Sequence, residues 1–155
     1  MPTDLSTGDE QPTVTPRCAD DRVLVCGRHR LVLSRPLVMG ILNLTSDSFS
    51  DGGRYLDPVA ALAAARQMVA DGADILDIGA ESTRPGAEPV DEWLEWQRLE
   101  PILTALAPIG VPLSVDSRRP SVMRRAVDAG ASMLNDVSGF ADPAAIAVAA
   151  EATEP

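Results

Sequence analysis

The sequence predicts an α/β fold, a TIM-type (β/α)8 barrel, here as its first four β-α units preceded by a β-hairpin. Four short apolar runs alternate with four helical segments between residues 37 and 150, which is typical of a parallel sheet with right-handed crossovers. A doubly wound sheet also fits this alternation. A barrel is favoured because polar side chains follow each apolar run, and in a barrel these strand ends meet at one mouth. A closed barrel takes roughly 250 residues, so four strands leave the sheet open.

The N-terminal part divides into a tail and a hairpin. Residues 1–20 are rich in Pro, Thr, Asp and Glu, a composition that predicts a disordered tail. Two β-rich runs, 23–26 and 30–33, then flank a turn at 27–29 and predict the hairpin. We therefore divide the chain into the tail and a barrel half that spans residues 21–155.

Each β-α unit carries its own boundary signals. The first strand is the continuous apolar run 37–42, as expected for a strand covered on both faces. The first helix begins with Asp57 as N-cap and Pro58 as first residue, and it ends at Asp71-Gly72, because Gly is the usual C-terminal stop. By the same signals the other strands are expected at 75–78, 112–115 and 132–134, and the other helices at about 91–107, 120–129 and 142–150. Pro101 is expected to bend the second helix.

Composition limits the partners and the compartment. The net charge is -10 and all thirteen basic residues are Arg, so nucleic acid and anionic membranes are poor partners. Cys18 and Cys26 lack metal-type spacing and predict free thiols. Neither a membrane-spanning run nor a signal peptide is visible in the sequence, so we expect a cytoplasmic protein.

Two long loops follow the first two strands and carry most of the candidate chemistry. Loop 43–53 offers the Asn43 amide, several hydroxyls, and carboxylates such as Asp51 beside a Gly pair, a set that suits a metal-bound diphosphate. In loop 77–87, Arg84 is the obvious anion binder, because a guanidinium grips phosphate oxygens in pairs. A plain surface turn remains the alternative for each loop.

Two further polar groups end the third and fourth strands. Asp116 can accept paired N–H donors from a heterocycle such as an aminopyrimidine, and Asn135 can both donate to and accept from a ring edge. The alternatives are a helix cap for Asp116 and a turn residue for Asn135.

Other candidates are weaker. His29 is expected to be an exposed turn residue, and Trp93 and Trp96, three apart, to pack on the second helix. The arginines of the third helix predict an exposed face; they are Arg118, Arg119, Arg124 and Arg125. Glu81 is expected to orient or pair with Arg84.

These segments resemble a known family. Residues 39–45 with 48–53, and residues 77–86, resemble the two loop signatures of dihydropteroate synthase, and the likeness runs from about residue 23 to 150. This sequence has Ser46 where the family usually has Pro, and Gly79-Ala80 where it usually has Gly-Gly.

The resemblance implies an enzyme of folate biosynthesis. Such a transferase condenses 6-hydroxymethyl-7,8-dihydropterin diphosphate with 4-aminobenzoate, uses Mg2+, is the target of sulfonamides and is typically homodimeric. It implies Asn43 as metal ligand, Arg84 and Asp51 as catalytic residues, and a set of substrate-binding residues, namely Thr83, Pro85, Asp116 and Asn135. Diphosphate would leave to give a pterin-stabilised cation, which the arylamine attacks.

The alternative function is non-catalytic. The family's second half supplies further pterin and diphosphate contacts, which cannot be mapped here. A truncated or divergent paralogue acting as a pterin-binding or interaction half-barrel therefore stays open. A pterin-binding methyltransferase is disfavoured, because the Ser82-Thr83-Arg84-Pro85-Gly86 loop is typical of the synthase.

Overall fold

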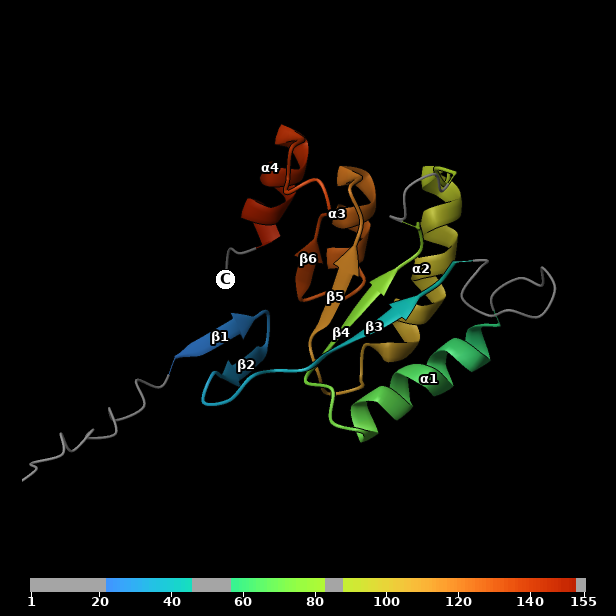
Figure 1. Ribbon diagram of the computed structural model, residues 1–155. Helices are drawn as coiled ribbons and strands as arrows, with labels where there is room; N and C mark the ends of the chain where they lie inside the picture. The colour runs from blue at the N-terminus through green and yellow to red at the C-terminus, as the bar shows by residue number, and fades with distance from the viewer. Residues whose placement is uncertain (1–21, 46–56, 83–87, 153–155) are drawn as a thin grey trace, which may run out of the picture.

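The computed structural model describes residues 22–45, 57–82 and 88–152 (Figure 1). A β-hairpin comes first, and strands and helices then alternate. The elements are β1 (Val23–Cys26), β2 (His29–Val32), β3 (Met39–Asn43), α1 (Pro58–Ala70), β4 (Ile75–Gly79), α2 (Glu92–Leu106), β5 (Leu113–Asp116), α3 (Pro120–Asp128), β6 (Met133–Asn135) and α4 (Pro143–Ala152). The predicted tail, residues 1–20, lies outside the described residues.

The sheet confirms the α/β class. Strands β3, β4, β5 and β6 pair in that order, and every pairing is parallel. Strands β1 and β2 form a separate antiparallel sheet, with Cys26 opposite His29. Within the described ranges the four-stranded sheet is open and does not close into a barrel.

Side-chain caps and glycines explain where the helices begin and end; Asp57 was predicted as a cap, whereas Asp91 was predicted only as the start of its helix. The side chains of Asp57, Asp91 and Asp142 accept hydrogen bonds from the backbone N–H two residues on, at 3.0, 2.9 and 2.8 Å, which satisfies donors that a helix start leaves unpaired. At the other end, α1 and α3 are followed by Gly72 and Gly130 with φ of 105° and 100°, a conformation that glycine adopts without strain.

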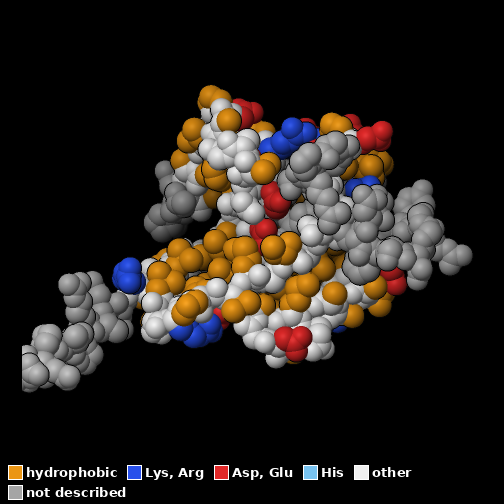
Figure 2. All heavy atoms as spheres, in the orientation of Figure 1, with side chains coloured by type: hydrophobic (Ala, Val, Ile, Leu, Met, Phe, Trp, Pro, Cys, Tyr) orange, Lys and Arg blue, Asp and Glu red, His pale blue; other side chains and the backbone are white. Residues whose placement is uncertain are grey.

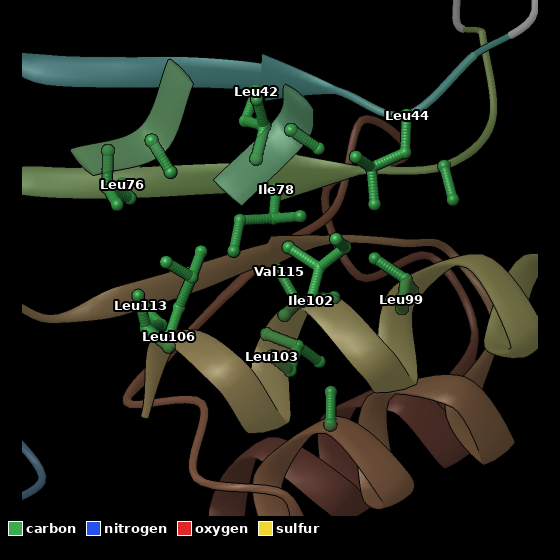
Figure 3. Close-up of a cluster of buried hydrophobic side chains, with 14 of the residues drawn as sticks. Leu42, Leu44, Leu76, Ile78, Leu99, Ile102, Leu103, Leu106, Leu113 and Val115 are labelled. Carbon is green, nitrogen blue, oxygen red and sulfur yellow. The ribbon is translucent and has the colours of Figure 1, made fainter. Parts of the chain in front are cut away.

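The core lies between the sheet and the helices (Figure 3). Side chains from one face of β3, β4 and β5 meet those of α2, as Figure 3 shows for Leu42, Ile78 and Val115 against Leu99 and Leu103. A second, smaller cluster joins α3 to α4 through Met123, Ala145 and Val148. Burial of these apolar side chains is the main force that holds each helix on the sheet.

The opposite face of the sheet is different. Side chains alternate between faces along a strand, so Met39, Ile41 and Asn43 share the face of β3 that points away from Leu42. These three are exposed, Ile41 by 59%, whereas Leu42 is 2% exposed. Figure 2 shows hydrophobic side chains gathered in the middle of the visible face, around β3 and the hairpin.

Some side-chain expectations need correction. His29 belongs to β2 and is half-buried, because the turn is the pair Gly27-Arg28. Trp96 packs against the core and lies 5.9 Å from the Arg125 guanidinium, but Trp93 is 62% exposed and does not pack. Cys26 is a free, buried thiol as predicted, while Cys18 lies outside the described residues. No described helix is long and apolar enough to cross a membrane.

Candidate functional site

Three of the predicted site residues, Asn43, Asp116 and Asn135, lie at the carboxyl end of the sheet. Asn43 of β3 is opposite Gly79 of β4, Gly79 is opposite Asp116 of β5, and Asp116 is opposite Asn135 of β6. One layer across the sheet therefore carries an amide, a glycine, a carboxylate and a second amide. Asn43 and Asn135 are exposed and Asp116 is half-buried.

Asp77 lies inside its strand and not at its end. Strand β4 continues to Gly79, so Asp77 lies one layer deeper, opposite Ser114, and is 5% exposed. The sequence placed the end of this strand at residue 78, one residue early, because Gly79 has no side chain that would mark it as part of the strand.

Gly79 packs against the side chain of Asp116. A Cβ atom added at Gly79 would lie 3.4 Å from the Asp116 Cβ and 3.5 Å from its Oδ2. The next residue, Ala80, is fully buried in the core. Gly79 therefore presents no side chain on the face of the sheet that carries Asp116, and the methyl group of Ala80 points into the core on the opposite face.

A hydrogen bond joins two of the polar strand residues. Asn135 Nδ2 donates to Asp77 Oδ2 at 3.0 Å, and the two residues are 58 positions apart. The other Asp77 oxygen, Oδ1, is buried and has no hydrogen-bond partner among the described residues. The backbone carbonyl of Asn135 accepts from the Ser117 N–H at 3.0 Å, which ties β6 to the end of β5.

Asp116 lies in a negative environment. Burial, followed by the charges of Asp77, Glu95, Asp136 and Glu81, raises the pKa of Asp116 to about 6, because each effect disfavours its ionised form. The alternative reading of Asp116 as a helix cap is wrong: the N-cap of α3 is Arg119, and it is the Ser117 hydroxyl that accepts from the Arg119 N–H.

Asp136 has a structural role next to the site. Its carboxylate accepts from the Ser138 N–H and hydroxyl at 2.8 Å each, and from the Phe140 N–H at 2.9 Å. It therefore holds the loop that leads from β6 to α4. Asp136 therefore differs in role from Asn135, whose side chain bonds to Asp77, although the two residues are adjacent in the sequence.

An arginine network that the sequence did not predict lies beside Asp116. Arg119 was expected on an exposed helix face, yet its side chain is only 19% exposed and pairs with Glu81 and with the fully buried Glu95. It also donates to the Val90 carbonyl, and Arg118 pairs with Glu81 at 2.8 Å. Burial raises the pKa of Glu95, and the Ser117 hydroxyl and Arg119 oppose that shift.

This network joins the two sides of a loop. Glu81 and Val90 stand on either side of residues 83–87, and Arg119 binds both. The expected pairing of Glu81 with Arg84 lies outside the described residues; the described partners of the Glu81 carboxylate oxygens are Arg118 and Arg119. The sequence does contain a signal for this position. Arg119 directly precedes Pro120, the first residue of α3, and therefore lies near the carboxyl end of β5.

Other predicted site residues are not described. Asp51, Thr83, Arg84 and Pro85 fall in the ranges 46–56 and 83–87, outside the described residues. Of the metal-binding prediction, only Asn43 can be placed. The described part of the chain contains no group of three or more His, Cys, Asp or Glu side chains that could hold a metal ion by itself.

The arrangement is typical of α/β proteins that bind small molecules. Strand ends of a parallel sheet present an acceptor-rich edge, with the Asp116 carboxylate beside the Asn135 amide, and such edges are where α/β folds bind ligands. A carboxylate and an amide oxygen side by side suit a heterocycle that carries N–H donors.

The particular family follows from comparison. A model described as "Pterin binding enzyme" matches residues 39–155, and the chain belongs to this family. The type-2 dihydropteroate synthase of Escherichia coli is 49% identical over 108 residues, 70% of this chain and 40% of the relative. The dihydropteroate synthase of Bacillus subtilis is 52% identical over 123 residues, 78% of this chain and 43% of the relative.

Solved structures agree with the fold. The Xanthomonas albilineans dihydropteroate synthase with 4-aminobenzoic acid has a TM-score of 0.79 and 47% identity, covering 86% of this chain and 49% of that one. The Burkholderia cenocepacia enzyme complexed with 7,8-dihydropteroate has a TM-score of 0.71 and 49% identity, covering 81% and 41%. The chain thus spans less than half the length of each relative.

Proposed function

We propose that the protein acts as a dihydropteroate synthase of folate biosynthesis, condensing 6-hydroxymethyl-7,8-dihydropterin diphosphate with 4-aminobenzoate and releasing diphosphate. The observation that carries the proposal is the pair Asp116 and Asn135, side by side at the carboxyl edge of the sheet, in a chain about half identical to named synthases. These relatives are named as synthases, which favours a part of a catalytic protein over a divergent, non-catalytic paralogue.

In this proposal the described residues bind and orient the pterin. The ionised Asp116 accepts N–H donors of the pterin ring, and Asn135 completes the contact with its amide. Gly79 leaves the ring edge free to approach Asp116. The reaction needs no protein nucleophile, because the arylamine attacks the carbon that loses diphosphate, and the task of the site is to hold the ring and stabilise charge.

The residues that contact the diphosphate are also proposed. Thr83, Pro85 and Arg84 would contact the substrates from loop 77–87, with Arg84 binding diphosphate oxygens in pairs, and Asp51 would act from loop 43–53. These assignments rest on the resemblance of the two loops to the family signatures.

Asn43 fits a Mg2+ ion that the substrate itself helps to hold. Mg2+ usually keeps several waters and takes one or two protein oxygens together with substrate phosphates. Asn43 offers an exposed amide oxygen at the site edge, which suits such sparse coordination. When bound there, Mg2+ would neutralise charge on the departing diphosphate.

The barrel architecture, the oligomeric state and the location of the protein are also proposals. We infer that the open sheet is the first half of a TIM-type barrel, with residues 21–155 as one unit. The support is the bare face of β3 and the match to longer synthase structures. A homodimer and a cytoplasmic location follow from the resemblance alone.

The test is formation of dihydropteroate from the two substrates. Because the chain spans less than half of its relatives, we expect no measurable product from the 155-residue chain alone. Joined after α4 to the part of the Bacillus subtilis synthase that the chain does not match, it should turn over. In that fusion, Asp116→Ala should lower kcat/KM by about 100-fold, since a hydrogen bond to a charged group is lost. A folded fusion without activity, or an active one that is indifferent to Asp116→Ala, would contradict the proposal.

A further inference from the structure

Asp77 is a buried acid that the proposed binding contacts do not use. It is 5% exposed and lies in the middle of β4, the strand between those that carry Asn43 and Asp116. Its Oδ2 accepts the hydrogen bond from Asn135 Nδ2, whereas its Oδ1 is buried without a partner among the described residues.

A contribution to stability does not explain why an acid is buried at position 77. A buried carboxylate oxygen that lacks a hydrogen bond destabilises a fold, and the neighbouring acids worsen the effect. Asp116 is faced by Asp77, Glu95, Asp136 and Glu81, and these charges help to raise its pKa. A Leu or Val at position 77 would avoid both costs, so the position points to a requirement of the site.

That requirement is visible in the orientation of Asn135. Asp77 Oδ2 accepts its hydrogen bond from the NH2 end of the Asn135 amide, and a carboxylate has no donor to offer the amide oxygen. Since oxygen and nitrogen lie on opposite sides of the amide carbon, the oxygen of Asn135 is directed away from Asp77. The backbone of Asn135 is fixed as well, by the bond from the Ser117 N–H.

We infer that Asp77 is a positioning residue that holds the Asn135 amide with its oxygen presented beside Asp116, so that the site selects a pteridine carrying a 2-amino group over one carrying a 2-oxo group. The inference rests on the proposed function for its ligand. Two neighbouring acceptors favour a ring edge that bears N–H donors, and they repel a carbonyl oxygen in the same place.

Replacing Asp77 by asparagine tests the orientation of the Asn135 amide without a large change in packing. In Asp77→Asn, the new side chain has almost the same shape but can donate or accept, so the Asn135 amide is free to turn over. The reciprocal double variant, Asp77→Asn with Asn135→Asp, exchanges donor and acceptor. It again leaves an acceptor oxygen beside Asp116, at unchanged net charge. Asp71→Asn, at the C-terminal end of α1, is a matched control for loss of one carboxylate.

The experiment compares equilibrium binding of pterin and of lumazine, its 2-oxo counterpart, by ligand fluorescence. We expect the wild-type chain to prefer pterin. Asp77→Asn should lower that preference about tenfold, the worth of one oriented hydrogen bond, the double variant should regain most of it, and Asp71→Asn should keep it. A preference unchanged in Asp77→Asn would overturn the inference.

A second measurement needs no ligand. In NMR spectra of the wild-type chain the Asn135 side-chain NH2 should be shifted and protected from exchange by Asp77, and Asp77→Asn should abolish both effects. The same variant should lower the pKa of Asp116, because it removes one of the charges that raise it. If the wild-type chain binds neither pteridine, the proposed function fails for this chain alone, and the NMR result still decides the role of Asp77. If the shift and the exchange protection of the Asn135 NH2 group are the same in Asp77→Asn as in wild type, the inference is wrong.

Discussion

The Asp116 side chain lies against Gly79, within 4 Å of the place where a Cβ atom on this residue of β4 would be. A Cβ atom at position 79 would be in ordinary contact, 3.4 Å from the Asp116 Cβ and 3.5 Å from its Oδ2, so we expect a larger, branched side chain to press on the carboxylate. We therefore expect the glycine of the loop signature to affect the proposed ligand binding through its neighbour on β5.

From this contact we predict that the loss of pterin affinity grows with the size of the side chain at position 79. Gly79→Ala should leave pterin affinity within about twofold of wild type, because the methyl group fits, whereas Gly79→Val should lower it about tenfold by displacing the Asp116 carboxyl from its hydrogen-bonding position. Titration calorimetry of both variants measures the difference. Equal effects of Ala and Val would show that the space over Gly79 does not control Asp116.

Pterin binding should depend on pH through Asp116. The pKa of this carboxyl is raised to about 6, so the acceptor form is lost as the pH falls through 6, and affinity should fall with it. The effect on stability has the opposite direction. A folded pKa above the unfolded value means that the folded state holds the proton more tightly, so stability should decrease as pH rises from about 4 to 6 and then level off.

Asp116→Asn is the matched control for both pH effects. It cannot titrate, so its weaker binding should be flat between pH 5 and 7, and the slope of stability against pH in the same range should become smaller. A wild-type affinity that stays constant from pH 7 to 5 would contradict the assignment of Asp116 as the charged acceptor.

The buried arginine network should be important for stability. Arg119→Met leaves Glu95 buried without its partner, which typically costs about 3 kcal/mol of unfolding free energy. Arg124→Met removes the exposed pair with Glu151 and should have a much smaller effect, because solvent screens that pair. Urea denaturation measures both. The double variant Arg119→Met with Glu95→Leu should recover part of the loss, and similar costs for both arginines would refute this role of the network.

The sequence predicted the order of the elements well, and the fine structure of the site less well. Asp57 and Gly72 are local signals, since a cap or a stop acts within one turn of its own residue, and the structure confirms both of them. The bond between Asp77 and Asn135 depends on the register of two non-adjacent strands, which no local pattern encodes. Arg119 was misplaced for a similar reason, because its partner Glu95 is buried only once α2 packs on the sheet.

The bare face of β3 should make the isolated 155-residue chain self-associate. Ile41 is 59% exposed on a strand edge that no other described strand pairs with, and unpaired edges with apolar faces favour association. Ile41→Thr should therefore shift the sedimentation profile toward monomer. Val59→Thr changes a valine that is even more exposed, at 72%, but lies on α1, so it should leave association unchanged. If the wild-type chain is a monodisperse monomer that unfolds cooperatively, the β3 face is covered in solution, and the half-barrel interpretation of the open sheet is wrong.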